Sequence, residues 1–230
     1  MINVHAVNVN HRLDESTFEH LMLYIKPERR AKIRRFHSLE DAQRALIADI
    51  LLRIVICSEL GIKNKEIIFD KNEYGKPFLK GNHSFHFNIS HAGDWVVCAT
   101  HSSPVGIDIE QIQPISFDIA KRFFSKNEYI DLMNIDDLQR LSYFYDLWTL
   151  KESYIKAAGK GLFIPLNSFA IRINDNDIRI ETENEFSDCF FKRYSFESDY
   201  KMAVCGRIND FSNDVIVKEL NKMCDEMLIM

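Results

Sequence analysis

The order of its helical and strand-like segments is the feature that most constrains the fold of this chain. The opening INVHAVNV alternates apolar and polar side chains with the period of a β-strand. Beyond it, patterning comes in two rounds: helices over 14–25 and 38–60, strands over 66–112, helices over 116–133 and 137–158, and strands over 169–207. A final helical tail is expected from near Asp214. Two runs of helices followed by strands predict the α+β class.

The two rounds predict two α+β halves of similar size, residues 1–104 and 105–230, that meet near Pro104. The 230 residues suit one to two domains, although no residue-level repeat is visible between the halves. A long helix is expected over Ser38–Leu60, with Ser38 as N-cap and Gly61 at its end, and its few polar residues predict that it is buried. A cleft between such halves is a common place for a ligand.

Composition excludes several classes of protein. Lys and Arg number 29 against 34 Asp and Glu, a net charge of −5, so no overall field attracts nucleic acid or an anionic membrane. The five cysteines are odd in number and lack CxxC spacing, which favours reduced thiols in a cytoplasmic protein. The start of the chain does not resemble a signal peptide, and no apolar run approaches the ~20 residues of a membrane span.

A pair of carboxylates stands on the strand VGIDIE, residues 105–110. The strand period places Asp108 and Glu110 side by side on one face. Like charges this close repel unless a cation, a proton or solvent intervenes. The pair fits either the polar outer face of an edge strand or a site for Mg²⁺.

The segment 141–156, which is expected to be helical, also carries charged residues that fit either a surface position or a metal site. At about 100° per residue, an apolar stripe faces the core, formed by Leu141, Phe144, Trp148 and Ile155. Lys151 falls inside this stripe, Glu152 at its edge, and Lys156 one turn after Glu152. Either Glu152 and Lys156 form a surface pair, or Glu152 is a third carboxylate beside Asp108 and Glu110, with lysines nearby for phosphate oxygens.

Three segments are candidates for binding phosphate. Residues 26–35 carry six Lys or Arg side chains against one Glu, the YGKP turn presents Lys76 beside Pro77, and FNISH ends in Ser90 and His91. Each also has a structural interpretation, as a solvated face, a plain turn or a capped strand end. The chain has neither a P-loop nor a GxGxxG fingerprint, which excludes those two nucleotide-binding classes.

Together these segments resemble the surfactin-type (Sfp-like) 4′-phosphopantetheinyl transferases over nearly the whole length. The two family signatures stand complete as VGID at 105–108 and WTLKESYIK at 148–156. EYGKP, FNISH, RFFSKNEY and a GKGL run followed by PL resemble further family segments in the expected order. The resemblance implies two pseudo-symmetric α+β halves with coenzyme A in the cleft between them.

The resemblance also implies roles for individual residues. It assigns Mg²⁺ to Asp108, Glu110 and Glu152, and places Lys156 on the pyrophosphate. Glu152 is the candidate for deprotonating the carrier serine, either directly or through a metal-bound water. The residues implied in coenzyme A binding are Arg29 and Lys32 at the 3′-phosphate, Lys76 and Pro77 at the adenine, Ser90 and His91 at the phosphates, and Asp108, Lys151 and Lys156. Two positions depart from the family: Arg29 stands where close relatives have Lys, and Ala92 where a small hydroxyl is usual.

The implied reaction is Mg²⁺-dependent transfer of 4′-phosphopantetheine from coenzyme A to a serine of an apo peptidyl or acyl carrier protein, as in holo-acyl-carrier-protein synthases. The expected protein is a cytoplasmic monomer that binds neither nucleic acid nor membrane, and its segment 114–129 is a candidate for carrier docking. Two alternatives stay open: a Mg²⁺-dependent phosphohydrolase acting on a nucleotide, and a non-enzymatic module binding nucleotide or RNA through residues 26–35.

Overall fold

The computed structural model describes residues 1–174 and 177–229. The helices are α1 (Glu15–Met22), α2 (Pro27–Ile33), α3 (Leu39–Leu60), α4 (Asp118–Phe123), α5 (Lys126–Asn134), α6 (Asp137–Ala158) and α7 (Leu220–Ile229), with 3₁₀ turns at Asn64–Glu66, Gly161–Phe163 and Leu166–Ser168. The strands are β1 (Ile2–Asn8), β2 (Phe69–Lys71), β3 (Pro77–Leu79), β4 (His86–Ala92), β5 (Trp95–His101), β6 (Val105–Gln111), β7 (Ala170–Asn174), β8 (Asp177–Glu181), β9 (Phe190–Tyr194), β10 (Tyr200–Gly206) and β11 (Phe211–Lys218).

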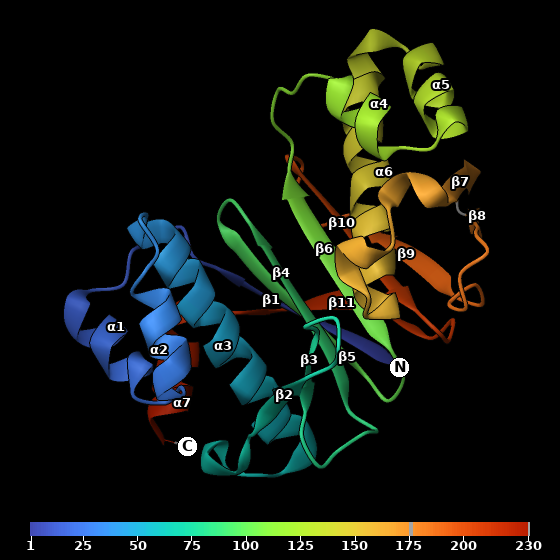
Figure 1. The fold of residues 1–230 in the computed structure, drawn as a ribbon. Helices are drawn as coiled ribbons and strands as arrows, with labels where there is room; N and C mark the ends of the chain where they lie inside the picture. Colours follow the sequence, from blue (N-terminus) through green and yellow to red (C-terminus); the bar gives the residue numbers. More distant parts are fainter. Residues whose placement is uncertain (175–176, 230) are drawn as a thin grey trace.

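The two halves repeat one topology. Each runs strand, three helices, a small hairpin and two further strands, from β1 to β5 and again from β6 to β10. The strands pair in the same antiparallel order, β1-β5-β4 and β6-β10-β9. The third helix of each half has 22 residues and ends at a left-handed glycine, Gly61 or Gly159. This confirms the predicted α+β fold with two pseudo-symmetric halves (Figure 1).

Three hydrophobic cores hold these layers together. Helix α3 packs on one face of the first sheet, and α6 packs on one face of the second. The opposite faces of the two sheets meet in a third core, where Val97 of β5, Ile107 of β6 and Val204 of β10 are fully buried. Burial at this spacing follows from the strand period, because alternate side chains point to opposite faces. Figure 1 shows the strands β4, β5 and β6 between the two long helices α3 and α6.

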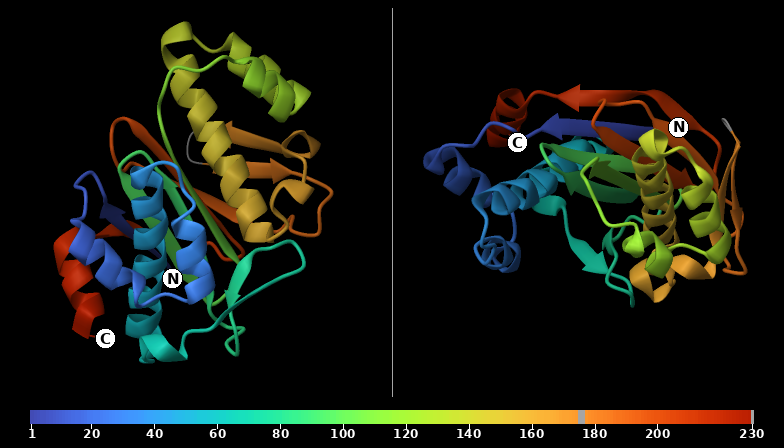
Figure 2. Two further views of the ribbon diagram at one scale, coloured as in Figure 1. Left: turned by 60° about the vertical axis from the view of Figure 1, so that its left-hand side comes forward. Right: turned by 90° about the horizontal axis from the view of Figure 1, so that it is seen from above.

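The end of the chain corrects two expectations. A helix was expected from near Asp214, but residues Phe211–Lys218 form β11, which pairs in parallel with β1. The run Val215–Val217 explains this, since β-branched side chains favour strands over helices. The helix α7 begins at Leu220 and packs against α1 and α3. Residues 211–229 thus lie with the first half, not with 105–210 as predicted (Figure 2).

The helix α3 follows its sequence signals closely. The Ser38 side chain accepts a hydrogen bond from the backbone N–H of Asp41, and Gly61 ends the helix at φ 65°. The strand expected at 66–69 is displaced, because residues 64–66 form a 3₁₀ turn and β2 starts at Phe69. Among the described residues, no helix has the length and apolar character needed to cross a membrane.

Candidate functional site

A groove of about 480 Å³ runs between helices α2 and α3 and the strands β2 to β4. Residues at helical spacing on α3, from Ala45 to Arg53, form its floor. Phe69, Phe87 and Ile89 make its walls largely apolar, and His91 stands at one end. The groove therefore has the mixed lining that suits a ligand with an aromatic and a charged part.

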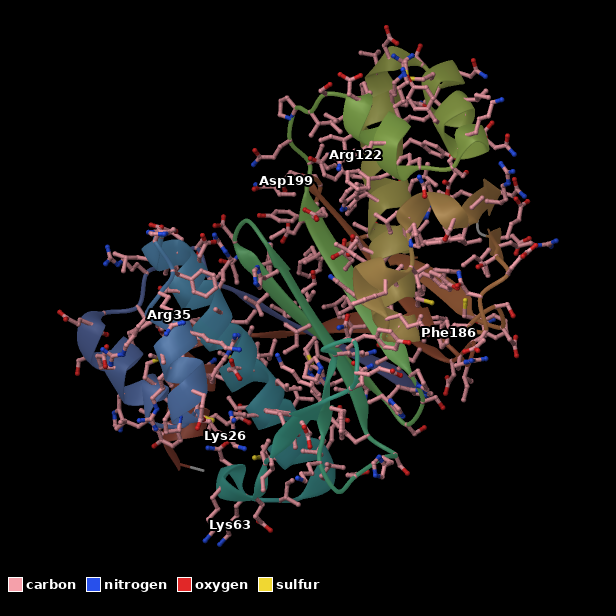
Figure 3. The ribbon with its side chains drawn as sticks, viewed as in Figure 1. Lys26, Arg35, Lys63, Arg122, Phe186 and Asp199 are labelled. Carbon is pink, nitrogen blue, oxygen red and sulfur yellow. The ribbon has the colours of Figure 1, made fainter. Side chains whose placement is uncertain are left out.

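The basic segment divides between this groove and the outer surface. Lys26, Arg29 and Lys32 recur every three residues and line the groove. Arg30 instead donates to the carbonyls of Leu23 and Ile25, and Arg34 pairs with Glu19. Arg29 donates through Nε to the carboxylate of Asp49. Figure 3 labels Lys26 and Arg35, the residues that bracket the α2 segment.

The strand β4 sends its two candidate side chains in opposite directions. His91 lies with Phe87 and Ile89 on the groove side. Ser90, one residue earlier, turns to the second half, where its hydroxyl donates to Asp108 Oδ1 over 2.9 Å. The strand period explains the split. A ligand that fills the groove and reaches past His91 therefore comes to the junction of the halves.

The junction centres on Asp108, which is 2% exposed. Its Oδ1 accepts from Lys156 Nζ over 2.6 Å as well as from Ser90. Its Oδ2 is buried without a hydrogen-bond partner. Lys156 thus pairs with Asp108 and not with Glu152 in the surface pair considered above, and Asp108 faces α6 instead of solvent.

Gly106 explains why α6 can lie so close to β6. A Cβ at this position would stand 2.1 Å from the carbonyl oxygen of Ser153 and 2.4 Å from the backbone nitrogen of Ala157. These are backbone atoms of α6, which cannot move aside as a flexible side chain could. The glycine of the VGID signature is therefore required for the contact that brings Lys156 to Asp108.

Glu110 and Glu152 lie on either side of this contact, on β6 and α6. Burial, together with the charges of Asp108 and Glu152, raises the pKa of Glu110 to about 7. Burial and the Asp108 carboxylate raise the pKa of Glu152, and burial raises that of Asp108 against the effects of Lys156 and Ser90. The Asp108 carboxylate therefore disfavours the ionisation of both glutamates, as expected where carboxylates outnumber the positive charges beside them.

These carboxylates have the ligand chemistry that Mg²⁺ prefers, and the unpartnered Oδ2 of Asp108 is a buried acceptor without a donor. Within residues 1–174 and 177–229, no three His, Cys, Asp or Glu side chains are already gathered as metal ligands. Glu110 senses the charges of Asp108 and Glu152, and their residue types are those that a Mg²⁺ site uses, so the assignment of the ion to these three residues stays a prediction.

Lys151 does not take the role that the resemblance implied. Its side chain is fully buried, and Nζ donates to both Glu128 oxygens and to the carbonyl of Phe169. The ammonium also lies 4.1 Å from the centre of the Phe169 ring. The predicted helical stripe placed Lys151 correctly toward the core, and for that reason it cannot contact coenzyme A.

Lys76 also departs from its expected place. Pro77 and Gly75 line the groove, but the Lys76 side chain leaves it and donates to the carbonyls of Lys156 and Val105 in the second half. Gly75 and Pro77, and not the Lys76 side chain, face the groove.

Sequence reasoning missed two groove residues, Asp49 and Arg53. Arg53 is 3% exposed, donates to Asn64 and stacks over Phe69 at 5.3 Å. Both residues are visible in the sequence as the charges inside the apolar run 45–57. A charge on a buried helix requires a partner or a ligand, and that signal could have found them.

Comparison with known proteins shows the family of the chain. A family model described as the 4′-phosphopantetheinyl transferase superfamily matches residues 104–205, and one described as 4′-phosphopantetheinyl transferase, N-terminal, matches residues 12–103. The chain is 45% identical to 4′-phosphopantetheinyl transferase Sfp of Bacillus subtilis (strain 168) over 93% of this chain and 96% of that protein. It is 39% identical to 4′-phosphopantetheinyl transferase gsp of Aneurinibacillus migulanus over 99% of this chain and 96% of that protein.

Among solved structures, a holo-(acyl-carrier-protein) synthase from Bacillus anthracis in complex with CoA (3′,5′-ADP) is 19% identical and aligns with 45% of this chain and 93% of its own, at a TM-score of 0.37. That structural likeness is too distant to support an argument. The relative from B. subtilis and the relative from A. migulanus, in contrast, each match over almost their entire length. By these matches and both family models, the chain belongs to the 4′-phosphopantetheinyl transferase superfamily.

Proposed function

We propose that this protein transfers the 4′-phosphopantetheine group of coenzyme A to a serine hydroxyl of an apo carrier protein and releases 3′,5′-ADP. The observation that carries the proposal is the continuity of the site. A groove with one basic face leads along β4 to a carboxylate–lysine cluster at the junction of the halves. The basic groove suits a nucleotide that carries an extra phosphate. The carboxylate–lysine cluster suits a pyrophosphate at which the transfer takes place.

The groove would bind the nucleotide end of coenzyme A. Phe69, Phe87 and Pro77 supply apolar surface for the adenine. Arg29 and Lys32 face the same space and would hold the 3′-phosphate through charge-assisted hydrogen bonds. Arg29 already pairs with Asp49. A bound phosphate would either replace the Asp49 carboxylate as the partner of Arg29 or share the guanidinium with it. His91, at the end of the groove nearest Ser90, would contact the phosphates.

At the junction, Asp108, Glu110 and Glu152 would hold Mg²⁺. When bound, the ion supplies positive charge to the pyrophosphate oxygens. Glu152 would accept the proton of the carrier serine, whose oxygen then bonds to the β-phosphorus of coenzyme A. The bond from that phosphorus to the oxygen of the 3′,5′-ADP leaving group breaks, and Lys156 would donate to the departing phosphate. The raised pKa of Glu152 brings its basicity closer to that needed for a proton acceptor.

The partners follow from the same reaction. The similarity to Sfp and gsp supports an Sfp-type enzyme acting on peptidyl or acyl carrier domains, rather than a dedicated holo-acyl-carrier-protein synthase. We propose that it acts as a cytoplasmic monomer, since the pseudo-symmetric halves already form a complete junction within one chain. The segment 114–129 remains our candidate for carrier docking, with Ile119 exposed on α4.

One assay tests the proposed function. The protein is incubated with coenzyme A, MgCl₂ and several apo carrier proteins, and the products are measured by intact mass spectrometry. We expect the carrier to gain one phosphopantetheine group, on serine, with one 3′,5′-ADP released for each. Hydrolysis of coenzyme A without a modified carrier would show a phosphohydrolase and overturn the proposal. Binding of RNA unaffected by Asp108→Asn, without turnover, would show a binding module instead.

A further inference from the structure

The turn from Asn72 to Lys76, here called the 72–76 turn, connects β2 to β3 and is held rigid by its own hydrogen bonds. Asn72 Oδ1 accepts from the backbone nitrogens of Tyr74 at 3.0 Å and Lys76 at 2.8 Å. Gly75 takes the left-handed conformation at φ 89°, which glycine adopts without strain. The backbone nitrogen of Asn72 closes the turn on the carbonyl of Lys76.

The 72–76 turn belongs to the first half, yet its side chains end on the second. Lys76 Nζ donates to the carbonyls of Lys156 at 2.6 Å and Val105 at 3.0 Å. Asn72 Nδ2 donates to the carbonyl of Gly159 at 2.8 Å. Lys156 is in the last turn of α6 and Gly159 is its C-cap. The last carbonyls of a helix have no partner within it and carry its negative dipole end, so an ammonium and an amide cap them well.

The same turn also forms a wall of the nucleotide groove, because Gly75 and Pro77 line that groove. One rigid turn therefore contacts the proposed nucleotide site on one side and the end of α6 on the other. Helix α6 carries Glu152 and Lys156, the two residues proposed for proton and phosphate transfer. Its Lys156 supplies both the side chain that reaches Asp108 and the carbonyl that Lys76 caps.

We propose that Lys76 and Asn72 are positioning residues, which fix the C-terminal end of α6 so that Glu152 and Lys156 stand at the junction in register with the nucleotide. This inference rests on the proposed function, and it replaces the role of Lys76 as a ligand of coenzyme A. The Lys76 ammonium is already surrounded by backbone carbonyls of the second half, facing away from the groove.

The desolvation of the half-buried Lys76 side chain supports a structural purpose for these contacts. Burial lowers its pKa to about 8, so the folded protein holds a desolvated charge that water would otherwise stabilise. Lys80 and Lys71 of the same hairpin remain exposed at the surface. If the only role of these lysines were to keep the hairpin soluble, Lys76 would be expected to extend into solvent as Lys71 and Lys80 do.

Two variants test the proposal. Lys76→Met keeps the length of the side chain and removes the donor. Asn72→Asp keeps the oxygen that accepts from Tyr74 and Lys76 but replaces the amide donor to Gly159 with a carboxylate that repels its carbonyl. We expect kcat for carrier modification to fall about tenfold or more in each, because each loses hydrogen bonds that orient α6. Lys80→Met on the same hairpin is the control and should leave kcat unchanged.

The affinity for 3′,5′-ADP, measured by calorimetry, separates positioning from ligand contact. We expect its dissociation constant to change less than about threefold in both variants, since the groove residues are intact. A loss of 3′,5′-ADP affinity as large as the loss of kcat/KM would make Lys76 a ligand, and an unchanged kcat would remove any role; either overturns the proposal. Thermal denaturation shows whether each variant is folded, and Asn72→Asp alone suffices if Lys76→Met is not.

Hydrogen exchange gives a readout that does not depend on catalysis. We expect amides in the last turn of α6, residues 155–159, to exchange faster in both variants than in the wild type and Lys80→Met. Unchanged exchange in folded variants would overturn the proposal. If the wild type does not modify carriers but exchange still rises in the variants, the proposed function fails while the capping of α6 stands.

Discussion

Lys151 Nζ lies 2.7 Å from Glu128 Oε1, and neither side chain is more than 1% exposed. The pair joins α6 to α5. Glu128 extends it further, because its oxygens accept from the backbone nitrogens of Ser125 and Ile171. Lys151, a lysine of the family signature, thus holds helices α5 and α6 together. It comes one residue before the proposed base Glu152.

Replacing one partner of this pair should destabilise the protein more than replacing both partners with apolar residues. We expect Lys151→Met to lower the free energy of unfolding by about 3–5 kcal/mol, because Glu128 is left buried and unpaired. The double variant Lys151→Met with Glu128→Leu should recover a large part of that loss. Urea denaturation of the wild type, both single variants and the double variant measures the coupling. Additive losses would show that the two side chains do not depend on each other.

Gly106→Ala tests the close contact of β6 with α6. The added methyl group meets backbone atoms of Ser153 and Ala157, so we expect a loss of about 1–3 kcal/mol or more in the free energy of unfolding. Gly206→Ala is the control, since its methyl group would meet the flexible end of the Ile2 side chain. Equal losses by urea denaturation in the two variants would contradict a special requirement at Gly106.

Glu152→Gln separates proton transfer from metal binding. The substitution keeps one coordinating oxygen and the volume but cannot take the serine proton. We expect kcat to fall by about 10²–10⁴-fold, with a much smaller change in the affinity for coenzyme A and Mg²⁺. The acidic limb of the pH–rate profile should disappear as well. Full recovery of the rate at high MgCl₂ would show that Glu152 is a metal ligand and not the base.

The contrast between Lys151, Lys76 and Asp108 shows what could be predicted from sequence. The helix period predicted that Lys151 faces the core, and the strand period predicted that Asp108 and Glu110 share a face; the structure agrees with both patterns. Periodicity describes one element at a time. It could not tell that Lys76 crosses to the other half, or that Glu128 is the partner of Lys151, because those contacts depend on how separate elements pack.

The same limit explains the end of the chain. The residues of β11 carry a local preference for a strand, but their neighbour is β1, which lies some 200 positions earlier. The strand exists because the edge of the first sheet offers unpaired backbone groups to it. A sequence pattern contains no information on which edge is free, so the division at residue 105 misplaced this segment.

The raised pKa values of the junction carboxylates predict how stability responds to pH and to Mg²⁺. In the metal-free protein Glu110 has a pKa of about 7, above the value of about 4.3 in an unfolded chain. Between these values the folded protein retains a proton that the unfolded chain has lost. The stability contributed by protonated Glu110 is therefore complete below the lower value and is lost as pH rises through the higher one.

Mg²⁺ competes with that proton, since it binds the ionised carboxylates. We expect saturating MgCl₂ to raise the melting temperature little at about pH 5.5 and clearly more at about pH 8, relative to EDTA. Asp108→Asn and Glu110→Gln should each reduce the gain at the higher pH, while the exposed Glu73→Gln, away from the junction, should not. Differential scanning fluorimetry across this range measures the effect. A gain from Mg²⁺ that is the same at both pH values, or that survives in both junction variants, would place the metal elsewhere and leave Asp108, Glu110 and Glu152 without their proposed ion.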